Sequence, residues 1–178
     1  IKSISIDVKN PPAPLVAAVG DDSTDDTIAL QAIMDYISVL PNGGVMLISD
    51  GIYHVKNLKY RNNVSIRGNG KRSILKAHSS CVAWSSVLEC DGITGIDIDN
   101  VVFDGNKGVV AGDDQSGVFL TLLKDSTGIN IRNCTYQNNG YGGVFIKNSE
   151  RIFISNSEFL ELDCGIITTQ GLGRDIII

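Results

Sequence analysis

Several features that define common protein classes are scarce or missing in this chain of 178 residues. Acidic residues outnumber basic ones by 20 to 15, and the net charge of −5 argues against a nucleic-acid-binding protein, which usually presents a basic face. No apolar run approaches the roughly 20 residues that a membrane-spanning helix needs, so we expect no membrane insertion. No signal peptide is visible in the sequence, which begins at Ile1.

Histidine and cysteine are also few, and their placement argues against several kinds of active site. His54 lies within an apolar strand-like segment and His78 starts a polar loop, so the two histidines predict no Ser/His/Asp or Cys/His constellation. The four cysteines lack the spacing of metal ligands. We interpret them as buried free thiols, as in a protein that folds in a reducing compartment. We expect no metal and no cofactor.

The most informative feature present is a segment that recurs three times, at 96–104, 129–137 and 152–160. Each copy begins with two isoleucines that alternate with outward residues, the pattern of a strand with one buried face. Asparagine follows in every copy, and an aromatic residue stands three positions later (Asn100 and Phe103, Asn133 and Tyr136, Asn156 and Phe159). The same residue type at each corner is typical of a solenoid, whose coils place equivalent residues above one another.

The spacing of the repeat predicts a parallel β-helix of four or five coils. The second and third copies start 23 residues apart, at Ile129 and Ile152, which suits one coil of three short strands and three turns. The first interval, from Ile96, is 33 residues, and a loop-like insertion at 107–116 accounts for the difference. Val64 and Ile66 resemble an earlier rung, and Ile176 resembles a later one. We expect the stacked asparagines at the corners to form hydrogen bonds with turn groups, which serves stability rather than activity.

Before the repeat, the segment GDDSTDDTIALQAIMDYISVL predicts an amphipathic helix of about 16 residues. Ser23 or Thr24 would cap it, Asp25 and Asp26 would lie in its first turn, and Pro41 would end it. We attribute the four aspartates of this segment to capping and turn formation rather than to a metal site. The expected organisation is residues 1–44 as an N-terminal strand and capping helix, and 45–178 as the first coils of a β-helix that continues beyond the chain end.

The order of motifs from GDDSTDDT through the helix to GGVMLISDGIYHVKNLKYRNNVSIRGNGKRSILKA resembles the N-terminal part of pectate-lyase-like proteins. The resemblance covers residues 14–77 closely, and it departs at Ser49-Asp50, where the family usually has proline. It implies an all-β fold, a right-handed single-stranded parallel β-helix, whose N-terminal capping α-helix plugs the open end.

The resemblance also implies a class of function. None of the motifs of polygalacturonases (N-T-D, D-D, G-H-G, R-I-K) or of alginate epimerases (D-P-H-E) is present in recognisable form. Among the other members of the family, the sequence is most similar to bacteriophage tailspike or appendage proteins. It therefore implies a homotrimeric virion protein that binds and degrades a bacterial surface glycopolymer, such as capsule, O-antigen or wall teichoic acid. The alternatives are a cellular, secreted lyase or hydrolase of the pectin-active type and a non-catalytic adsorption or scaffold module.

Hydrolysis of a sugar polymer requires two carboxylates, and the densest acidic group on the predicted coils is Glu158, Glu161 and Asp163. Asp104 leaves the same corner two rungs away, so these four are the candidate catalytic residues. A solvated acidic turn would give the same pattern. Hydrolysis is favoured over a lyase reaction. A lyase needs a base together with a cation or an arginine that neutralises a uronate, and no such set is apparent in the sequence.

Exposed aromatic and basic residues are the candidate substrate-binding groups. Trp84 and Tyr141 lie in loop-like stretches and could stack on sugar rings, and Lys147 and Arg174 could meet anionic groups. Trp84 could equally pack under its own loop. Asp99 aligns with Arg132 and Arg67 on neighbouring rungs, which predicts a ladder of opposite charges.

Overall fold

The computed structural model describes residues 4–110, 117–169 and 176–177. Its helices are α1 (Thr27–Ser38) and the short 3-10 helix η1 (Gly70–Arg72). The strands are β1 (Ile4–Asp7), β2 (Asp21–Asp25), β3 (Gly44–Leu47), β4 (Gly51–Val55), β5 (Leu58–Lys59), β6 (Val64–Arg67), β7 (Ser73–Ala77), β8 (Ser86–Asp91), β9 (Thr94–Asp99), β10 (Val102–Asp104), β11 (Phe119–Lys124), β12 (Thr127–Arg132), β13 (Thr135–Lys147), β14 (Glu150–Ser155), β15 (Glu158–Thr169) and β16 (Ile176–Ile177). None of the described helices is long and apolar enough to cross a membrane.

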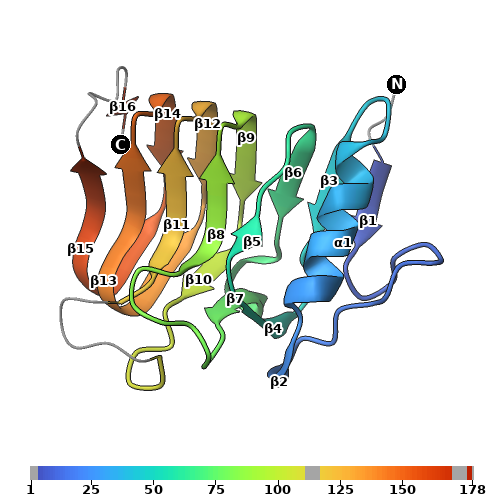
Figure 1. Ribbon diagram of the computed structural model, residues 1–178, viewed down its shortest axis with the longest axis horizontal. Coiled ribbons are helices and arrows are strands. Elements are labelled where there is room, and N and C mark those ends of the chain that lie inside the picture. The colour runs from blue at the N-terminus through green and yellow to red at the C-terminus, as the bar shows by residue number, and fades with distance from the viewer. Residues whose placement is uncertain (1–3, 111–116, 170–175, 178) are drawn as a thin grey trace.

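These strands wind into a right-handed parallel β-helix with three faces (Figure 1). Face 1 is the sheet β1-β3-β6-β9-β12-β14-β16. Face 2 consists of β2, β4, β7, β10 and the first parts of β13 and β15, and face 3 consists of β5, β8, β11 and the second parts of the same two strands. β13 and β15 bend from face 2 into face 3, which joins the two faces into one nine-stranded sheet.

The register between coils confirms the predicted repeat. Ile129 lies opposite Ile96 and Ile152 on face 1, and the expected earlier and later rungs also align, with Ile66 opposite Ile98 and Ile176 opposite Ile152. Strands β3, β6, β9, β12 and β14 each begin a coil, so the described residues form five coils. The longer interval arises between β10 and β11, where the inserted loop emerges; its residues 111–116 lie outside the described part.

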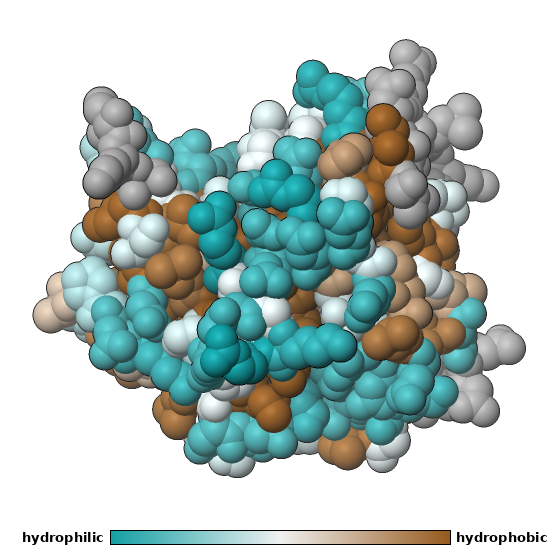
Figure 2. Space-filling view, turned by 180° about the vertical axis from the view of Figure 1, so that it is seen from behind, coloured by the Kyte–Doolittle hydropathy of each residue, from teal (hydrophilic) through white to brown (hydrophobic). Residues whose placement is uncertain are grey.

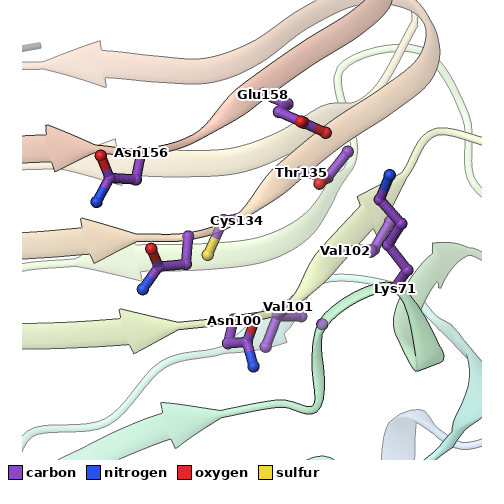
Figure 3. Close-up of a pocket in the computed structure, with 10 residues that line it drawn as sticks. Lys71, Asn100, Val101, Val102, Cys134, Thr135, Asn156 and Glu158 are labelled. Atoms are coloured by element: carbon purple, nitrogen blue, oxygen red, sulfur yellow. The ribbon is translucent and has the colours of Figure 1, made fainter.

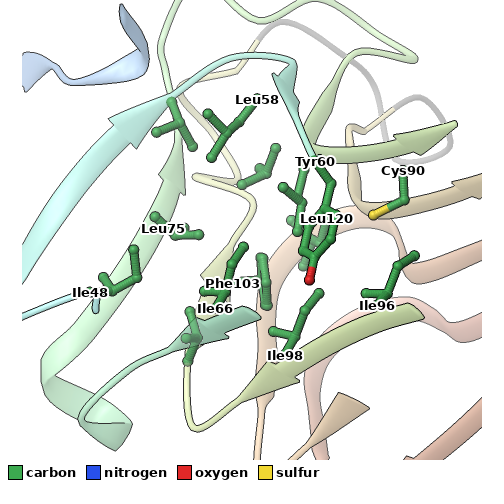
Figure 4. Close-up of a cluster of buried hydrophobic side chains, with 14 of the residues drawn as sticks. Ile48, Leu58, Tyr60, Ile66, Leu75, Cys90, Ile96, Ile98, Phe103 and Leu120 are labelled. Atoms are coloured by element: carbon green, nitrogen blue, oxygen red, sulfur yellow. The ribbon is translucent and has the colours of Figure 1, made fainter. Parts of the chain in front are cut away.

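The core is a continuous column of apolar side chains inside the coils (Figure 4). Phe103, Tyr136 and Phe159 stack within it, with ring centroids 5.0 and 5.1 Å apart and ring planes inclined by 7° in both pairs. Phe103 and Tyr136 are fully buried, and burial of such a side chain contributes about 1.5–3 kcal/mol. The aromatic residue of the sequence repeat is therefore an internal support for the stack.

The cysteines follow the prediction at three of four positions. Cys81, Cys90 and Cys134 are buried free thiols, and burial raises the pKa of the Cys134 thiol to about 11. The prediction was wrong for Cys164, which is exposed. This residue lies on β15, which pairs only with β13 among the described strands and is therefore less covered than the inner coils.

Helix α1 covers the first coil, as expected of a capping helix (Figure 1). Its apolar stripe of Leu30, Ile33, Met34 and Ile37 is buried against that coil. The helix begins later than the sequence predicted, at Thr27, and has no acidic residue in its first turn. The reason is that the Asp26 carboxylate accepts hydrogen bonds from the backbone N–H groups of Val19 (2.6 Å) and Gly20 (3.0 Å), so it holds the preceding segment instead.

The predicted charge ladder runs along the outer surface of face 1. Asp99 lies between Arg67 (4.0 Å) and Arg132 (3.8 Å), and Arg132 also contacts Asp97 at 2.9 Å. From behind, hydrophilic side chains dominate the middle of the surface, where strands of face 1 lie (Figure 2). Exposed pairs of this kind contribute only about 0.2–1 kcal/mol each, so the ladder adds to the register of face 1 without dominating stability.

The repeated asparagines occupy the corner between faces 1 and 2, and all of them adopt a left-handed backbone. The φ angles are 64° at Asn100, 54° at Asn133 and 48° at Asn156. Asn100 donates its side-chain amide to the Gly68 carbonyl at 3.3 Å, and Asn133 donates to the Asp99 carboxylate at 2.8 Å. Asparagine tolerates this conformation better than other residues with a side chain, so the corner selects it for its backbone as well as its amide.

Replacing Asn133 with alanine is expected to lower the free energy of unfolding by about 1 kcal/mol, because alanine tolerates a left-handed backbone poorly. Thermal unfolding should show a melting temperature lower by about 2–4 °C. Asn133→Gly is the matched control, since glycine accepts the backbone but lacks the amide. A glycine variant as unstable as the alanine variant would show that the amide bond to Asp99, and not the backbone conformation, sets the preference.

Candidate functional site

The outer surface of face 3 carries two carboxylates on one strand. On β8 the buried Cys90 points into the core, so its neighbours Glu89 and Asp91 point outward. Residues two apart on a strand have Cα atoms about 6.7 Å apart. The Cα atoms that carry the two carboxyl groups are therefore separated by a distance similar to the separation of about 6.5–9.5 Å between the carboxyl groups of inverting glycosidases.

Two columns of side chains extend from these carboxylates across the next coils. Glu89 lies in register with Leu122 on β11 and Phe145 on β13, and Asp91 lies in register with Lys124 and Lys147. The buried residues that flank the columns confirm that their side chains face outward. Face 3 thus presents an acidic pair beside an apolar column and a basic column.

Lysines hold both carboxylates. The Lys59 ammonium group pairs with Glu89, and the Lys124 ammonium group donates to Asp91 at 2.7 Å. The Asp91 carboxylate raises the pKa of Lys124, since it favours the charged ammonium form. Lys147, one coil further on, is exposed at the end of β13.

An aromatic cluster stands at the start of the same face. Trp84 lies edge-on to Tyr141 with ring centroids 5.0 Å apart, and Phe119 lies 5.9 Å from Trp84 and 4.5 Å from Phe145. The backbone N–H of Trp84 donates to the Gly117 carbonyl at 3.2 Å, so the loops that precede β8 and β11 hold each other. Trp84 remains 54% exposed and is free to stack on the apolar face of a sugar ring.

Three of the predicted binding residues thus share face 3: Trp84 and Tyr141 are in contact, and Lys147 ends β13, the strand that also carries Tyr141. Arg174 lies outside the described residues.

The predicted catalytic carboxylates lie elsewhere. Asp104 ends β10 on face 2 and is only 8% exposed. It accepts hydrogen bonds from the Asn106 backbone (2.8 Å) and from the side chains of Gln137 (2.8 Å) and Asn138 (3.0 Å). Its carboxylate therefore joins two coils through a satisfied network.

Glu158, Glu161 and Asp163 are exposed on β15, two coils from Asp104. Two coils correspond to about 10 Å at a strand spacing of about 4.8 Å. Glu161 has a left-handed backbone (φ 53°), like Asn138 at the equivalent corner of the previous coil (φ 54°). The structure places Glu161 and Asp163 at the corner between faces 2 and 3 and Glu158 at the start of face 2, all on the last described coil.

Glu158 also lines a groove of about 190 Å³ on the outer side of face 2. Figure 3 shows the amides of Asn100 and Asn156 in file along one side of the groove, with Lys71 reaching over Val102 and Glu158 at the far end. Glu158 therefore lies on face 2, whereas the aromatic cluster lies on face 3.

The structure brings the two histidines together, which the sequence did not indicate. Their rings lie edge to face, with centroids 6.0 Å apart. The Nε2 atom of the largely buried His54 lies 2.9 Å from the Asp22 carboxylate, which also accepts a hydrogen bond from Lys76 at 2.9 Å. The attribution of the aspartate segment to turns holds for Asp21, whose carboxylate accepts the backbone N–H groups of Ser23 and Thr24, but not for Asp22.

Sequence reasoning missed Glu89 and Asp91 because both acids precede Ile96, where the recognised repeat begins. The intervals from Glu89 to Leu122 and from Leu122 to Phe145 are 33 and 23 residues, the same two intervals that relate the isoleucine rungs. Extending the alignment backward by seven residues, from Ile96 to Glu89, would have placed both acids on one outer surface. Among the described residues no three His, Cys, Asp or Glu side chains gather as metal ligands.

A three-faced parallel β-helix with carboxylates, lysines and exposed aromatic rings on one long surface belongs to a class whose members include enzymes that degrade polysaccharides. Residues 16–171 match the profile of the family described as rhamnogalacturonase A/epimerase, pectate lyase-like, and the chain belongs to that family.

Individual relatives extend this likeness. A segment of 50 residues is 46% identical to an iota-carrageenase of Alteromonas macleodii, covering 28% of this chain and 10% of the carrageenase. A Parabacteroides merdae protein provisionally described as a glycosyl hydrolase superposes with a TM-score of 0.78 at 19% identity, over 97% of this chain and 84% of that one. The ORF18 protein of Geobacillus virus E2 superposes with a TM-score of 0.64 at 19% identity, over 85% of this chain and 29% of the viral one. The matching segment thus covers a tenth of the carrageenase, and the superposed part covers less than a third of the viral protein.

The Asp22 cluster makes a pH-dependent prediction. Hydrogen bonds from Lys76 and His54 lower the pKa of Asp22 below its usual value of 3.8. A carboxylate whose folded pKa is lowered stabilises the fold above its unfolded pKa and loses that contribution as the pH falls through the folded value. Asp22→Asn should therefore be less stable than the parent near neutral pH, and the gap should close in acid. Denaturant unfolding across pH tests this; a gap that stays constant as the solution is acidified would contradict it.

Proposed function

We propose that the chain is the β-helix of a phage tailspike or appendage that binds and hydrolyses a bacterial surface glycopolymer. The observation that carries the proposal is the outer surface of face 3, where an exposed aromatic cluster stands beside two outward carboxylates. Ring stacking would orient a sugar, and a pair of carboxylates is the minimum equipment for glycoside hydrolysis. The likeness to a viral protein over 85% of the chain supports a virion location.

The candidate catalytic pair is Glu89 and Asp91. In an inverting reaction one carboxylic acid protonates the leaving oxygen of the glycosidic bond, and the other carboxylate activates a water on the opposite face of the sugar. Lys59 and Lys124 hold the two groups outward, and Lys124 and Lys147 add positive charge along the path of the polymer. These charges favour a polymer with acidic groups, such as an acidic capsule or a teichoic acid. The appendage is expected to act as a homotrimer, as in the proteins that the sequence resembles.

A secreted, pectin-active enzyme of a cell is the second candidate function, and the family description favours it, since that description names a rhamnogalacturonase. A non-catalytic adsorption module would use the same aromatic surface for binding alone. The three candidates differ in which polymer is bound and in whether products form.

Product analysis of the full-length protein separates these functions. Incubation with purified capsule, wall teichoic acid and pectin is expected to shorten a bacterial polymer and create new reducing ends. Ultraviolet absorbance from unsaturated ends would instead identify a lyase, and new phosphomonoesters would identify phosphodiester cleavage. Shortening of pectin alone would favour the cellular enzyme, and binding without any product would favour the adsorption module.

Substitution of the carboxylates tests the assignment of the catalytic pair. Glu89→Gln and Asp91→Asn should each lower turnover at least about 100-fold, the scale of lost general acid or base catalysis. Their melting temperatures should change little, because exposed ion pairs contribute at most about 1 kcal/mol. Asp104→Asn, Glu158→Gln, Glu161→Gln and Asp163→Asn form the competing set. Loss of turnover in that set, with full turnover in the Glu89 and Asp91 variants, would move the catalytic site to the corner of face 2.

Truncation of Trp84 tests the binding surface. Trp84→Ala should weaken binding of the polymer about 10-fold while leaving unfolding nearly unchanged, because the ring is more than half exposed. Exposed Val82 in the same loop provides the control, Val82→Ala. Affinity electrophoresis in gels that contain the polymer would measure both. Equal migration of the two variants would remove Trp84 from the site.

A further inference from the structure

A pocket of about 450 Å³ lies where helix α1 meets the first strand of face 3. Its walls include Gln31 and Asp35 from the helix, and Asn57, Lys59 and Arg61 from the segment around β5. β5 pairs with β8, the strand that carries Glu89 and Asp91. The pocket is therefore the N-terminal continuation of face 3.

Gln31 fixes the helix to the strand along this pocket. Its side-chain oxygen accepts the backbone N–H of Lys59 at 2.7 Å, and its side-chain nitrogen donates to the Lys59 carbonyl at 3.0 Å and to Asp35 at 2.9 Å. The side chain thus satisfies both backbone groups of Lys59. Helix and strand form one rigid wall, which favours a preformed site.

Two basic side chains border the pocket. Arg61 donates through Nε to Asp35 at 2.7 Å, and its side chain is 43% exposed. A guanidinium group has five N–H donors, and the described contacts of Arg61 use only the one at Nε. Because Asp35 fixes the plane of the guanidinium, the terminal nitrogens are oriented in advance for an oxyanion, which matches their fork geometry.

Lys59 connects the pocket to the acidic pair. Its side chain is 46% exposed, lines the pocket and pairs with Glu89. A polymer that lies along face 3 with a sugar at Glu89 therefore passes Lys59 on the first coil, with Arg61 beside it, two residues further along the same segment. A charged substituent of the sugar at this coil would meet both cations and the amide of Asn57, also at the pocket.

From these contacts we propose that the pocket is an end subsite for an anionic substituent of the glycan, with Arg61 as its recognition group and Lys59 as its link to Glu89. The substituent is an oxyanion: a carboxylate, a sulfate ester or a phosphate. The proposal rests on the proposed function and adds two statements to it. An acidic substituent is bound at the N-terminal end of face 3, and the glycan runs parallel to the axis of the β-helix, so that the capping helix serves as a wall of the binding surface.

Affinity electrophoresis with defined polymers tests the proposal in the full-length protein. The probes are polygalacturonate for carboxylates, iota-carrageenan for sulfate esters, wall teichoic acid for phosphates, and dextran as a neutral polymer. Arg61→Ala should weaken binding of at least one acidic polymer about 10-fold, with Arg61→Lys intermediate, and should leave dextran migration unchanged. Rising salt should reduce the difference between the parent and Arg61→Ala.

Two further variants keep the result interpretable. Arg61→Gln retains a donor for Asp35 without the charge, so it should weaken binding of the acidic polymer about 10-fold even if the alanine variant does not fold. Arg72→Ala is the matched control, since Arg72 is also exposed and paired with an aspartate, Asp50 at 3.1 Å, but does not line the pocket. Its binding should equal that of the parent.

The outcomes separate this inference from the proposed function. If Trp84→Ala weakens binding but Arg61→Ala and Arg61→Gln bind every acidic polymer as the parent does, the subsite is refuted and the proposed function stands. If the Arg61 variants lose affinity for acidic polymers and dextran equally, recognition of charge is refuted. If the parent binds none of the polymers, the proposed function fails, and the subsite fails with it.

Discussion

Register between successive coils is the constraint on which the rest of this structure depends. Side chains alternate between core and surface with a period of two, so a slip of one residue would turn every isoleucine rung outward. The stacked rings of Phe103, Tyr136 and Phe159 and the left-handed asparagine corners prevent such a slip. With register held, equivalent positions on neighbouring coils form straight columns, and a site can be assembled from residues far apart in the sequence.

The parts of the fold that could be predicted are those in which one residue type recurs for one physical reason. The left-handed backbone at the corner selects asparagine, and burial in the core selects isoleucine and the aromatic residue. The repeat of 96–160 therefore predicted both the coils and their alignment. The start of α1 could not be predicted in the same way. Aspartate is common in the first turn of a helix, but the Asp26 carboxylate accepts hydrogen bonds from backbone N–H groups six and seven residues earlier.

The candidate site was harder to predict because its residues do not recur. Glu89, Leu122 and Phe145 occupy one column but have different chemistry, so no residue type marks the column in the sequence. Asp104 was conspicuous for the opposite reason, because it directly follows a recognisable rung. The structure shows its carboxylate enclosed by amides of the next coil, whereas Trp84 and Tyr141 meet through loops whose contact no local pattern encodes.

The bond between the Trp84 backbone and Gly117 has a consequence for how such a surface can change over time. The two loops that it joins belong to different coils, yet together they place one aromatic cluster. An insertion in either loop would shift rings contributed by the other and leave the strands beneath in register. If the proposed function holds, new polymer preferences arise in pairs of loops, while the scaffold that folds the chain is inherited intact.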